Sequence, residues 1–204
     1  MANIKNVVFD FGGVLIKWNP HYLYDKYFGS VEKATWFLEN ICRMEWNLQM
    51  DAGKPFAEGV AELQAIYPEW SEAIGIYHTR WIEMVPGAVE GTADLVRRLK
   101  AAGYGVYGLS NWSLETFSQV CDDYPILEEL DGMVVSGAEG VVKPNAEIYH
   151  LLFDRYSLVP SESIFVDDNV GNVEASIGVG MPAVQFKNAA QLERELKEVY
   201  GLEF

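Results

Sequence analysis

Short, strongly apolar segments alternate along the chain with longer stretches in which apolar residues recur at helical spacing. The apolar segments predict five β-strands, over residues 7–10, 105–110, 133–135, 164–167 and 183–185. Strands that alternate with amphipathic helices are typical of a parallel sheet that helices cover on both faces. We therefore expect an α/β fold with a Rossmann-like parallel sheet.

The stretch between the first two predicted strands has a different character, because residues 17–84 contain no convincing strand. Several of its apolar residues recur at helical spacing behind Pro55, which suits the first turn of a helix. Five of the six tryptophans also lie there. We expect residues 17–84 to form an all-helical cap domain, and residues 1–16 and 85–204 to form the α/β core, which resumes with a helix over residues 89–102. A cap over the strand ends indicates a small, enclosed substrate.

The composition agrees with a globular protein and narrows the classes of partner it could bind. Half of the 204 residues are apolar, which is enough to bury a sizeable core. The 15 basic and 30 acidic residues give a net charge of -15. This charge disfavours nucleic acid and anionic membranes as partners, because both would be repelled. A phosphate-bearing substrate would need local positive charge or a metal ion.

The chain shows no signal for secretion or membrane insertion. Its first residues lack the apolar run of a signal peptide, and no apolar stretch approaches the roughly 20 residues that span a bilayer. We expect a cytoplasmic protein. Cys42 and Cys121 have neither metal-ligand spacing nor the pattern of a disulfide framework, so we expect both to be reduced. The oligomeric state stays open.

Polar residues follow four of the predicted strands. The first strand is followed by Asp10 and then Gly12 and Gly13. The later ones are followed by Ser110 and Asn111, by Lys143, and by Asp167 and Asp168. The carboxyl ends of parallel strands form the ligand crevice of open α/β sheets. A buried charge is costly there unless chemistry or a cation uses it. Each residue alone is more often a cap or a turn, but the ordered set predicts a site.

The residue types at the first three strand ends suit the transfer of an anionic group. A carboxylate such as Asp10 can act as a covalent nucleophile. Ser110, Asn111 and the following helix start offer donors for phosphate or carboxylate oxygens. Lys143 is held extended by Pro144, which is expected to open the next core helix. Lys143 could neutralise both the nucleophile and an incoming anion.

The fourth strand end predicts a metal ion. Asp167 and Asp168 are adjacent carboxylates that would repel each other at a buried strand end without a partner. A hard cation with oxygen ligands is the simplest partner. The spacing of a calcium loop is not met, so magnesium fits better.

In this order the four segments resemble the motifs of the haloacid dehalogenase superfamily, in the subfamily with a helical cap between the first two motifs. The resembling segments are Asp10-Phe11-Gly12-Gly13-Val14, Leu109-Ser110-Asn111, Lys143-Pro144 with Ile148 and Tyr149, and Val166-Asp167-Asp168-Asn169 with Asn172. The resemblance implies that Asp10 is the nucleophile and that Ser110 and Lys143 hold the transferring group. The acidic fourth motif is similar to that of the family's magnesium-dependent phosphatases.

The resemblance also implies a mechanism. Magnesium would be held by Asp10, the Gly12 carbonyl and Asp168, with Asp167 as a second ligand or an outer partner. Asn172 would orient this group of ligands. The substrate would be a small phosphate monoester, sugar phosphates included. Asp10 would form an aspartyl-phosphate while Ser110, the Asn111 N–H and Lys143 hold the phosphoryl oxygens.

One position departs from the family pattern. Most of the family's phosphatases place a second aspartate two residues after the nucleophile, as a general acid and base, where this chain has Gly12. Losing such help costs roughly 10²- to 10⁴-fold in rate. Some sugar phosphatases of the family are similar in having glycine there. A cap side chain, a carboxylate of the fourth motif or the substrate itself could replace it.

Two alternatives and the choice of substrate stay open. A 2-haloacid dehalogenase would use Asp10 to attack carbon and Arg43 to bind the carboxylate and the departing halide, without a metal. A binding protein that has lost catalysis would also explain the glycine at position 12. Candidate specificity residues in the cap are Trp18, Asn19, Arg43 and Trp46, the last two one helical turn apart.

Overall fold

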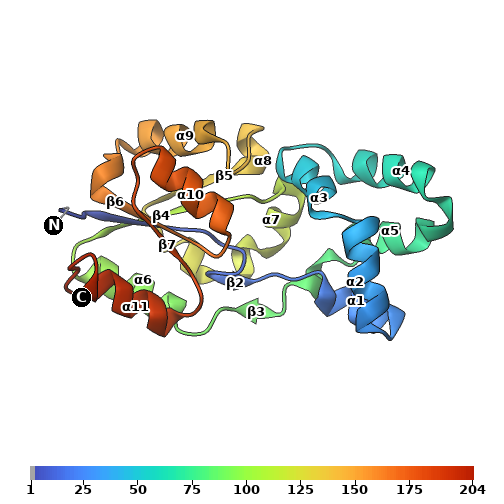
Figure 1. Ribbon diagram of the computed structural model, residues 1–204, viewed down its shortest axis with the longest axis horizontal. Helices are drawn as coiled ribbons and strands as arrows, with labels where there is room; N and C mark the ends of the chain where they lie inside the picture. Colours follow the sequence, from blue (N-terminus) through green and yellow to red (C-terminus); the bar gives the residue numbers. More distant parts are fainter. Residues whose placement is uncertain (1–2) are drawn as a thin grey trace.

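The computed structural model describes residues 3–204 as an α/β core with a helical insertion at one end (Figure 1). The core sheet contains β1 (Asn6–Phe9), β4 (Gly105–Ser110), β5 (Gly132–Val135), β6 (Ser163–Asp167) and β7 (Ala183–Gln185). Their order is β5-β4-β1-β6-β7, and every neighbouring pair is parallel. The predicted α/β class and the five predicted strands are confirmed.

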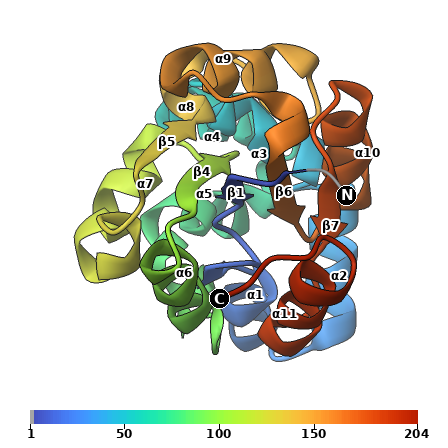
Figure 2. The same cartoon turned by 90° about the vertical axis from the view of Figure 1, so that its left-hand side faces the viewer.

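Helices cover both faces of this sheet (Figure 2). On one face lie α6 (Thr92–Ala101) and α11 (Ala189–Glu198), and on the other lie α9 (Ala146–Tyr156) and α10 (Val170–Gly178). The alternation of β1 separates the two layers, because Val7 and Phe9 belong to one buried apolar cluster and Val8 to the other. Burial on both faces explains why the strands are continuous apolar runs.

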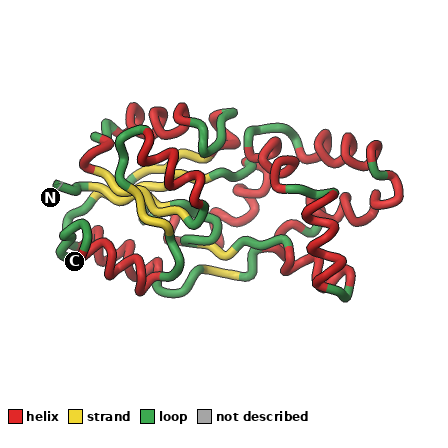
Figure 3. Tube along the Cα trace, in the orientation of Figure 1, coloured by secondary structure: helices red, strands yellow, loops and turns green. Residues whose placement is uncertain are grey.

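The insertion after β1 is helical, as expected, and stands beyond the strand ends (Figure 3). It contains α1 (His21–Phe28), α2 (Val31–Asn40), α3 (Met44–Asp51), α4 (Phe56–Ile66) and α5 (Ser71–Thr79). Fully buried aromatic side chains fill its centre, with Tyr24 and Phe37 at 4.9 Å between ring centroids. The chain enters the insertion through β2 (Ile16–Lys17) and leaves it through β3 (Gly87–Ala88), which pair antiparallel.

The remaining elements are short. They are α7 (Leu114–Val120) and α8 (Ser136–Glu139), with the 3₁₀ helices η1 (Pro68–Trp70), η2 (Trp81–Met84), η3 (Cys121–Asp123), η4 (Pro125–Leu127) and η5 (Pro160–Glu162). Within residues 3–204, no helix combines the length and the apolar character needed to cross a bilayer. Cys42 and Cys121 are free thiols, as expected.

Two helix starts differ from the predicted ones. The helix predicted from residue 89 begins at Thr92, because the Val89 N–H donates to Leu15 and Gly91 has a φ of 82°. Pro144 was expected to open the next core helix, but α9 begins at Ala146. Asn145 is its N-cap, accepting a hydrogen bond from the Glu147 N–H at 3.1 Å.

Candidate active site

The polar strand ends of the core and one face of cap helix α3 enclose a single cavity of about 420 Å³. The core contributes Asp10, Gly12, Gly13, Asn111, Trp112, Thr116, Lys143, Pro144, Asp168, Asn169 and Asn172, and residues 17–84 contribute Trp18, Trp81 and, from α3, Met44, Asn47, Leu48 and Asp51. The strand order reverses around β1, so Asp10 lies where open α/β sheets bind their ligands. The geometry therefore brings the candidates from all four motifs to one place.

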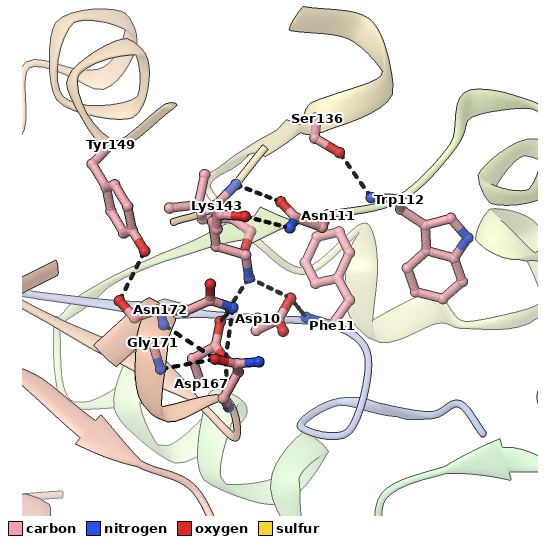
Figure 4. A network of polar contacts seen from close by, with 12 residues as sticks. Asp10, Phe11, Asn111, Trp112, Ser136, Lys143, Tyr149, Asp167, Gly171 and Asn172 are labelled. Carbon is pink, nitrogen blue, oxygen red and sulfur yellow. Dashed lines mark hydrogen bonds and ion pairs between the residues drawn. The ribbon is translucent and has the colours of Figure 1, made fainter. Parts of the chain in front are cut away.

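Lys143 connects two of the motif carboxylates (Figure 4). Its Nζ lies 2.9 Å from Asp10 Oδ1 and 2.7 Å from Asp167 Oδ2, and donates to the Leu109 carbonyl at 2.8 Å. Only 1% of the residue is exposed. Burial alone would lower the pKa of Lys143, but the charges of Asp10 and Asp167 raise it above its ordinary value. Lys143 therefore stays protonated.

Asp10 is a buried carboxylate at the centre of the site. Its Oδ1 accepts a hydrogen bond from the Phe11 N–H at 2.7 Å, which fixes the side chain toward the cavity. Burial raises the pKa of Asp10 to about 7 although the charge of Lys143 lowers it. A carboxylate with this pKa is partly ionised at neutral pH, and a bound cation would favour the ionised form further.

Asp167 lies behind Asp10 and is completely buried. Besides Lys143, its oxygens accept hydrogen bonds from the Asn169 N–H at 2.8 Å and from Asn172 Nδ2 at 3.0 and 3.2 Å. Tyr149 in turn donates its hydroxyl to the Asn172 carbonyl at 2.8 Å. With so many donors on its oxygens, Asp167 is better placed to orient Lys143 and Asn172 than to face the cavity.

The acidic groups fit a divalent cation. Asp10, Asp167 and Asp168 each offer an oxygen, and these oxygens lie within 4.8 Å of one another. Burial and the charge of Asp167 raise the pKa of Asp168. The one buried lysine cannot balance three carboxylates, so a hard cation with oxygen ligands would stabilise the cluster. Gly12 lines the cavity beside them, as the proposed carbonyl ligand requires.

Ser110 and Asn111 differ in what they can offer a ligand. The Ser110 hydroxyl is buried close enough to Asp10 to lower the pKa of that carboxyl, but no group among the described residues meets hydrogen-bond geometry with it. A buried hydroxyl without a well-formed hydrogen bond is unusual, and this one is available to donate to a ligand oxygen. Asn111 instead binds the Lys143 backbone, with Oδ1 accepting from its N–H at 2.8 Å and Nδ2 donating to its carbonyl at 2.9 Å. Its side chain therefore positions Lys143.

The structure separates the four specificity candidates. Trp18 lines the cavity, but Asn19 is exposed just before α1, where its Oδ1 accepts a hydrogen bond from the His21 N–H at 2.9 Å. Arg43 and Trp46 line a different hollow within the cap. Arg43 pairs with Glu45 at 3.1 Å, and Trp46 donates its Nε1 to the Gly59 carbonyl at 3.0 Å. The prediction that Arg43 and Trp46 face the crevice is wrong, because they lie on the other side of α3.

Sequence reasoning missed the residues of α3 that do line the cavity. Asn47, Leu48 and Asp51 lie three, four and seven residues after Met44, which places all four on one face of a helix. Asn47 and Asp51 are buried and polar. The signal available in the sequence was the four-residue spacing of Asn47 and Asp51, which places two polar side chains on the same face near the end of a helix.

Comparisons with known proteins agree with this geometry. Residues 4–180 match the family described as haloacid dehalogenase-like hydrolase. A sesquiterpene phosphatase of Aspergillus oryzae is 27% identical over 206 aligned residues, which cover 98% of each chain. A D-ribitol-5-phosphate phosphatase of Bacteroides thetaiotaomicron is 25% identical, over 95% of this chain and 97% of the relative.

A solved structure shares the fold. It is a haloacid dehalogenase family enzyme from Bacteroides thetaiotaomicron in complex with magnesium and inorganic phosphate, which matches with a TM-score of 0.70 at 21% identity. The match covers 91% of this chain and 95% of that one. With the family match over most of its length, this chain belongs to the haloacid dehalogenase-like hydrolases.

Proposed function

We propose that this protein is a magnesium-dependent phosphatase that hydrolyses a small phosphate monoester through an aspartyl-phosphate on Asp10. The observation that carries the proposal is the arrangement of Asp10 between a buried lysine and a second carboxylate, Asp168, at the floor of the cavity. The names of the two relatives, which act on a sesquiterpene phosphate and on D-ribitol 5-phosphate, support this reaction class.

Asp10 carries out the covalent step. One of its carboxylate oxygens attacks phosphorus, the bond from phosphorus to the ester oxygen breaks, and the electron pair leaves with the alcohol. Lys143 and the free hydroxyl of Ser110 bind the other phosphoryl oxygens, which gather negative charge. A water molecule then attacks phosphorus, the bond to Asp10 breaks, and inorganic phosphate leaves.

The residues around Asp10 would hold the metal ion. Asp10, Asp168 and the Gly12 carbonyl would be direct ligands, and Asp167 would support them from behind with Asn172. Magnesium would neutralise charge on the phosphoryl group and help to orient it. Because Asp167 already accepts hydrogen bonds from three donor groups, we propose that it supports the metal ligands without contacting the ion.

The experiment is a screen of phosphate release from small phosphate esters, with magnesium and with a chelator. The account expects turnover that needs magnesium, and a loss of at least about 10²-fold in Asp168→Asn because a ligand is lost. Asp154→Asn changes an exposed aspartate far from the cavity and serves as the matched control. Phosphate release that survives the chelator, or equal rates in the two variants, would contradict the proposal.

The same screen separates the alternatives. The dehalogenase interpretation needed Arg43 in the cavity, but Arg43 lies outside it and pairs with Glu45. Halide release from a 2-haloacid in the presence of a chelator would favour that interpretation. Binding of phosphate esters without turnover would favour a non-catalytic protein.

A further inference from the structure

We propose that Asp51, in the cap, is the general acid that protonates the departing alcohol and the base that then activates water. This inference rests on the proposed phosphatase activity. Gly12 has no side chain that could act as a general acid and base, and the inference assigns this role to a residue of the cap.

Asp51 lies on the correct side of the cavity for a proton donor. In-line attack by Asp10 pushes the leaving oxygen away from Asp10, toward the opposite wall. That wall is helix α3, which stands across from the strand ends (Figure 1). Within residues 3–204, Asp51 is the one carboxylic acid that the cap contributes to the cavity lining.

The orientation of the Asp51 carboxyl is fixed by neighbours on both oxygens. Oδ1 accepts a hydrogen bond from the Ser113 N–H at 3.0 Å, and Oδ2 accepts one from Asn47 Nδ2 at 2.9 Å. Tyr77 extends this series of hydrogen bonds, because its hydroxyl donates to Asn47 Oδ1 at 3.0 Å. Each carboxylate oxygen keeps a second lone pair, so a proton or a substrate oxygen can still be bound.

The surroundings of Asp51 let it hold a proton near neutral pH. Only 8% of the residue is exposed, and burial raises the pKa of Asp51 to about 7 while the Ser113 N–H and the charge of Lys143 lower it. The other titratable neighbour is the Tyr77 phenol, whose pKa is raised by burial, so it stays neutral. A general acid works best with a pKa near the working pH.

Asp51 gives up one proton and takes one back in each catalytic cycle. As the bond from phosphorus to the ester oxygen breaks, that oxygen takes the proton of the Asp51 carboxyl and leaves as a neutral alcohol. The Asp51 carboxylate then takes a proton from the water that attacks the aspartyl-phosphate on Asp10. Asp51 is protonated again when inorganic phosphate leaves.

A purely structural role for Asp51 is the rival explanation. The residue also joins the cap to the core, because its backbone carbonyl accepts the Ser136 hydroxyl at 2.6 Å and its side chain accepts the Ser113 N–H. If Asp51 acts only as this connection, its loss should slow every substrate alike. A general acid matters only where the leaving group is a poor one.

The test compares Asp51→Asn with the wild-type protein on an alkyl phosphate and on p-nitrophenyl phosphate, whose leaving group needs no proton. We expect kcat/KM to fall roughly 10²- to 10⁴-fold on the alkyl phosphate and by less than about tenfold on p-nitrophenyl phosphate. Ser136→Ala is the matched control, since it breaks the same junction without touching the carboxyl. It should change both values by the same factor.

Equal losses on the two substrates, or no loss on the alkyl phosphate, would overturn the assignment. If Asp51→Asn does not fold, the wild-type pH profiles decide. Then kcat/KM for the alkyl phosphate should fall above pH about 7, where that for p-nitrophenyl phosphate does not. Coincident profiles would contradict the role of Asp51. Failure of the wild-type protein on every phosphate ester would instead refute the proposed function itself.

Discussion

Lys143 Nζ and Asp10 Oδ1 lie 2.9 Å apart, with 1% of the lysine side chain and 11% of the aspartate side chain exposed. The same Nζ lies 2.7 Å from Asp167. One buried cation therefore pairs with two buried carboxylates at the ends of neighbouring strands. This ion pair ties the stability of the core to the charge state of the nucleophile.

Replacing Lys143 by methionine should destabilise the protein by about 3–5 kcal/mol at pH about 8, because two buried carboxylates lose their cation. The loss should be smaller near pH 5, because burial raises the pKa of Asp10 to about 7 and its carboxyl can take up a proton there. Urea unfolding at the two pH values measures it. Lys197→Met, which removes an exposed ion pair to Glu193, should cost less than about 1 kcal/mol. Equal costs in the two variants would contradict this account.

Replacing Ser110 by alanine should separate binding from stability. Its hydroxyl has no partner among residues 3–204, so its loss should change the free energy of unfolding by less than about 1 kcal/mol. Inhibition by inorganic phosphate should weaken roughly 10- to 100-fold, the value of one hydrogen bond to a charged group.

The matched control for Ser110 is Ser163, a buried serine at the other end of the sheet. Its hydroxyl donates to the Val159 carbonyl at 3.0 Å and accepts from Asn6 at 3.2 Å. Ser163→Ala should cost stability, about 1–2 kcal/mol, and leave phosphate inhibition unchanged. Unchanged phosphate inhibition in Ser110→Ala would show that its hydroxyl binds no phosphate.

Replacing Gly13 by alanine should weaken magnesium binding. Gly13 has a φ of 78°, and a Cβ there would lie 2.5 Å from Asp168 Oδ2, so Asp168 must move. Gly29 has a similar φ of 63° with no described atom within 4 Å of an added Cβ, so Gly29→Ala carries the backbone strain alone. Both should lose about 1–2 kcal/mol of stability. Only Gly13→Ala should need at least about tenfold more magnesium for half-maximal activity, and equal requirements would refute the role of Asp168.

The stability of the metal-free protein should depend on pH through Asp51. Its pKa in the folded state, about 7, exceeds the ordinary 3.8, so between these values the folded protein keeps a proton that the unfolded chain has lost. The resulting stabilisation is complete below pH about 4 and is lost as the pH rises through 7. Asp51→Asn lacks this titration. Its free energy of unfolding, relative to wild type, should rise by up to about 4 kcal/mol between pH about 4 and 8. Parallel stability curves for the two proteins would show that Asp51 keeps its ordinary pKa.

The strand ends were predictable because one pattern fixes both fold and site. Apolar runs identify buried parallel strands, and the residue after each run, Asp10 or Ser110 for example, must then lie at the common edge. The sequence could not assign the outer position that we propose for Asp167, because the proposal rests on its contacts with Lys143, 24 residues earlier in the chain, and with Asn172.

The cap was predictable as a helical insertion but not in its details. Helical spacing predicts which residues share a face, yet not which face of α3 turns to the core. The cationic and aromatic side chains of Arg43 and Trp46 suggested contacts with a substrate. Trp46 instead packs against Gly59, and this orientation of α3 turns Asp51 toward the cavity. The start of α6 was likewise decided by the Val89 contact with Leu15, which no local pattern contains.

The most direct test of the account is to trap the aspartyl-phosphate. The protein is mixed with magnesium and p-nitrophenyl phosphate, quenched in acid, and reduced with borohydride, which converts an aspartyl-phosphate into homoserine. Peptide mass spectrometry should find homoserine at position 10 in wild type and none in Asp10→Asn or in the chelated sample. Turnover of the ester with no modification at Asp10 would contradict the central claim.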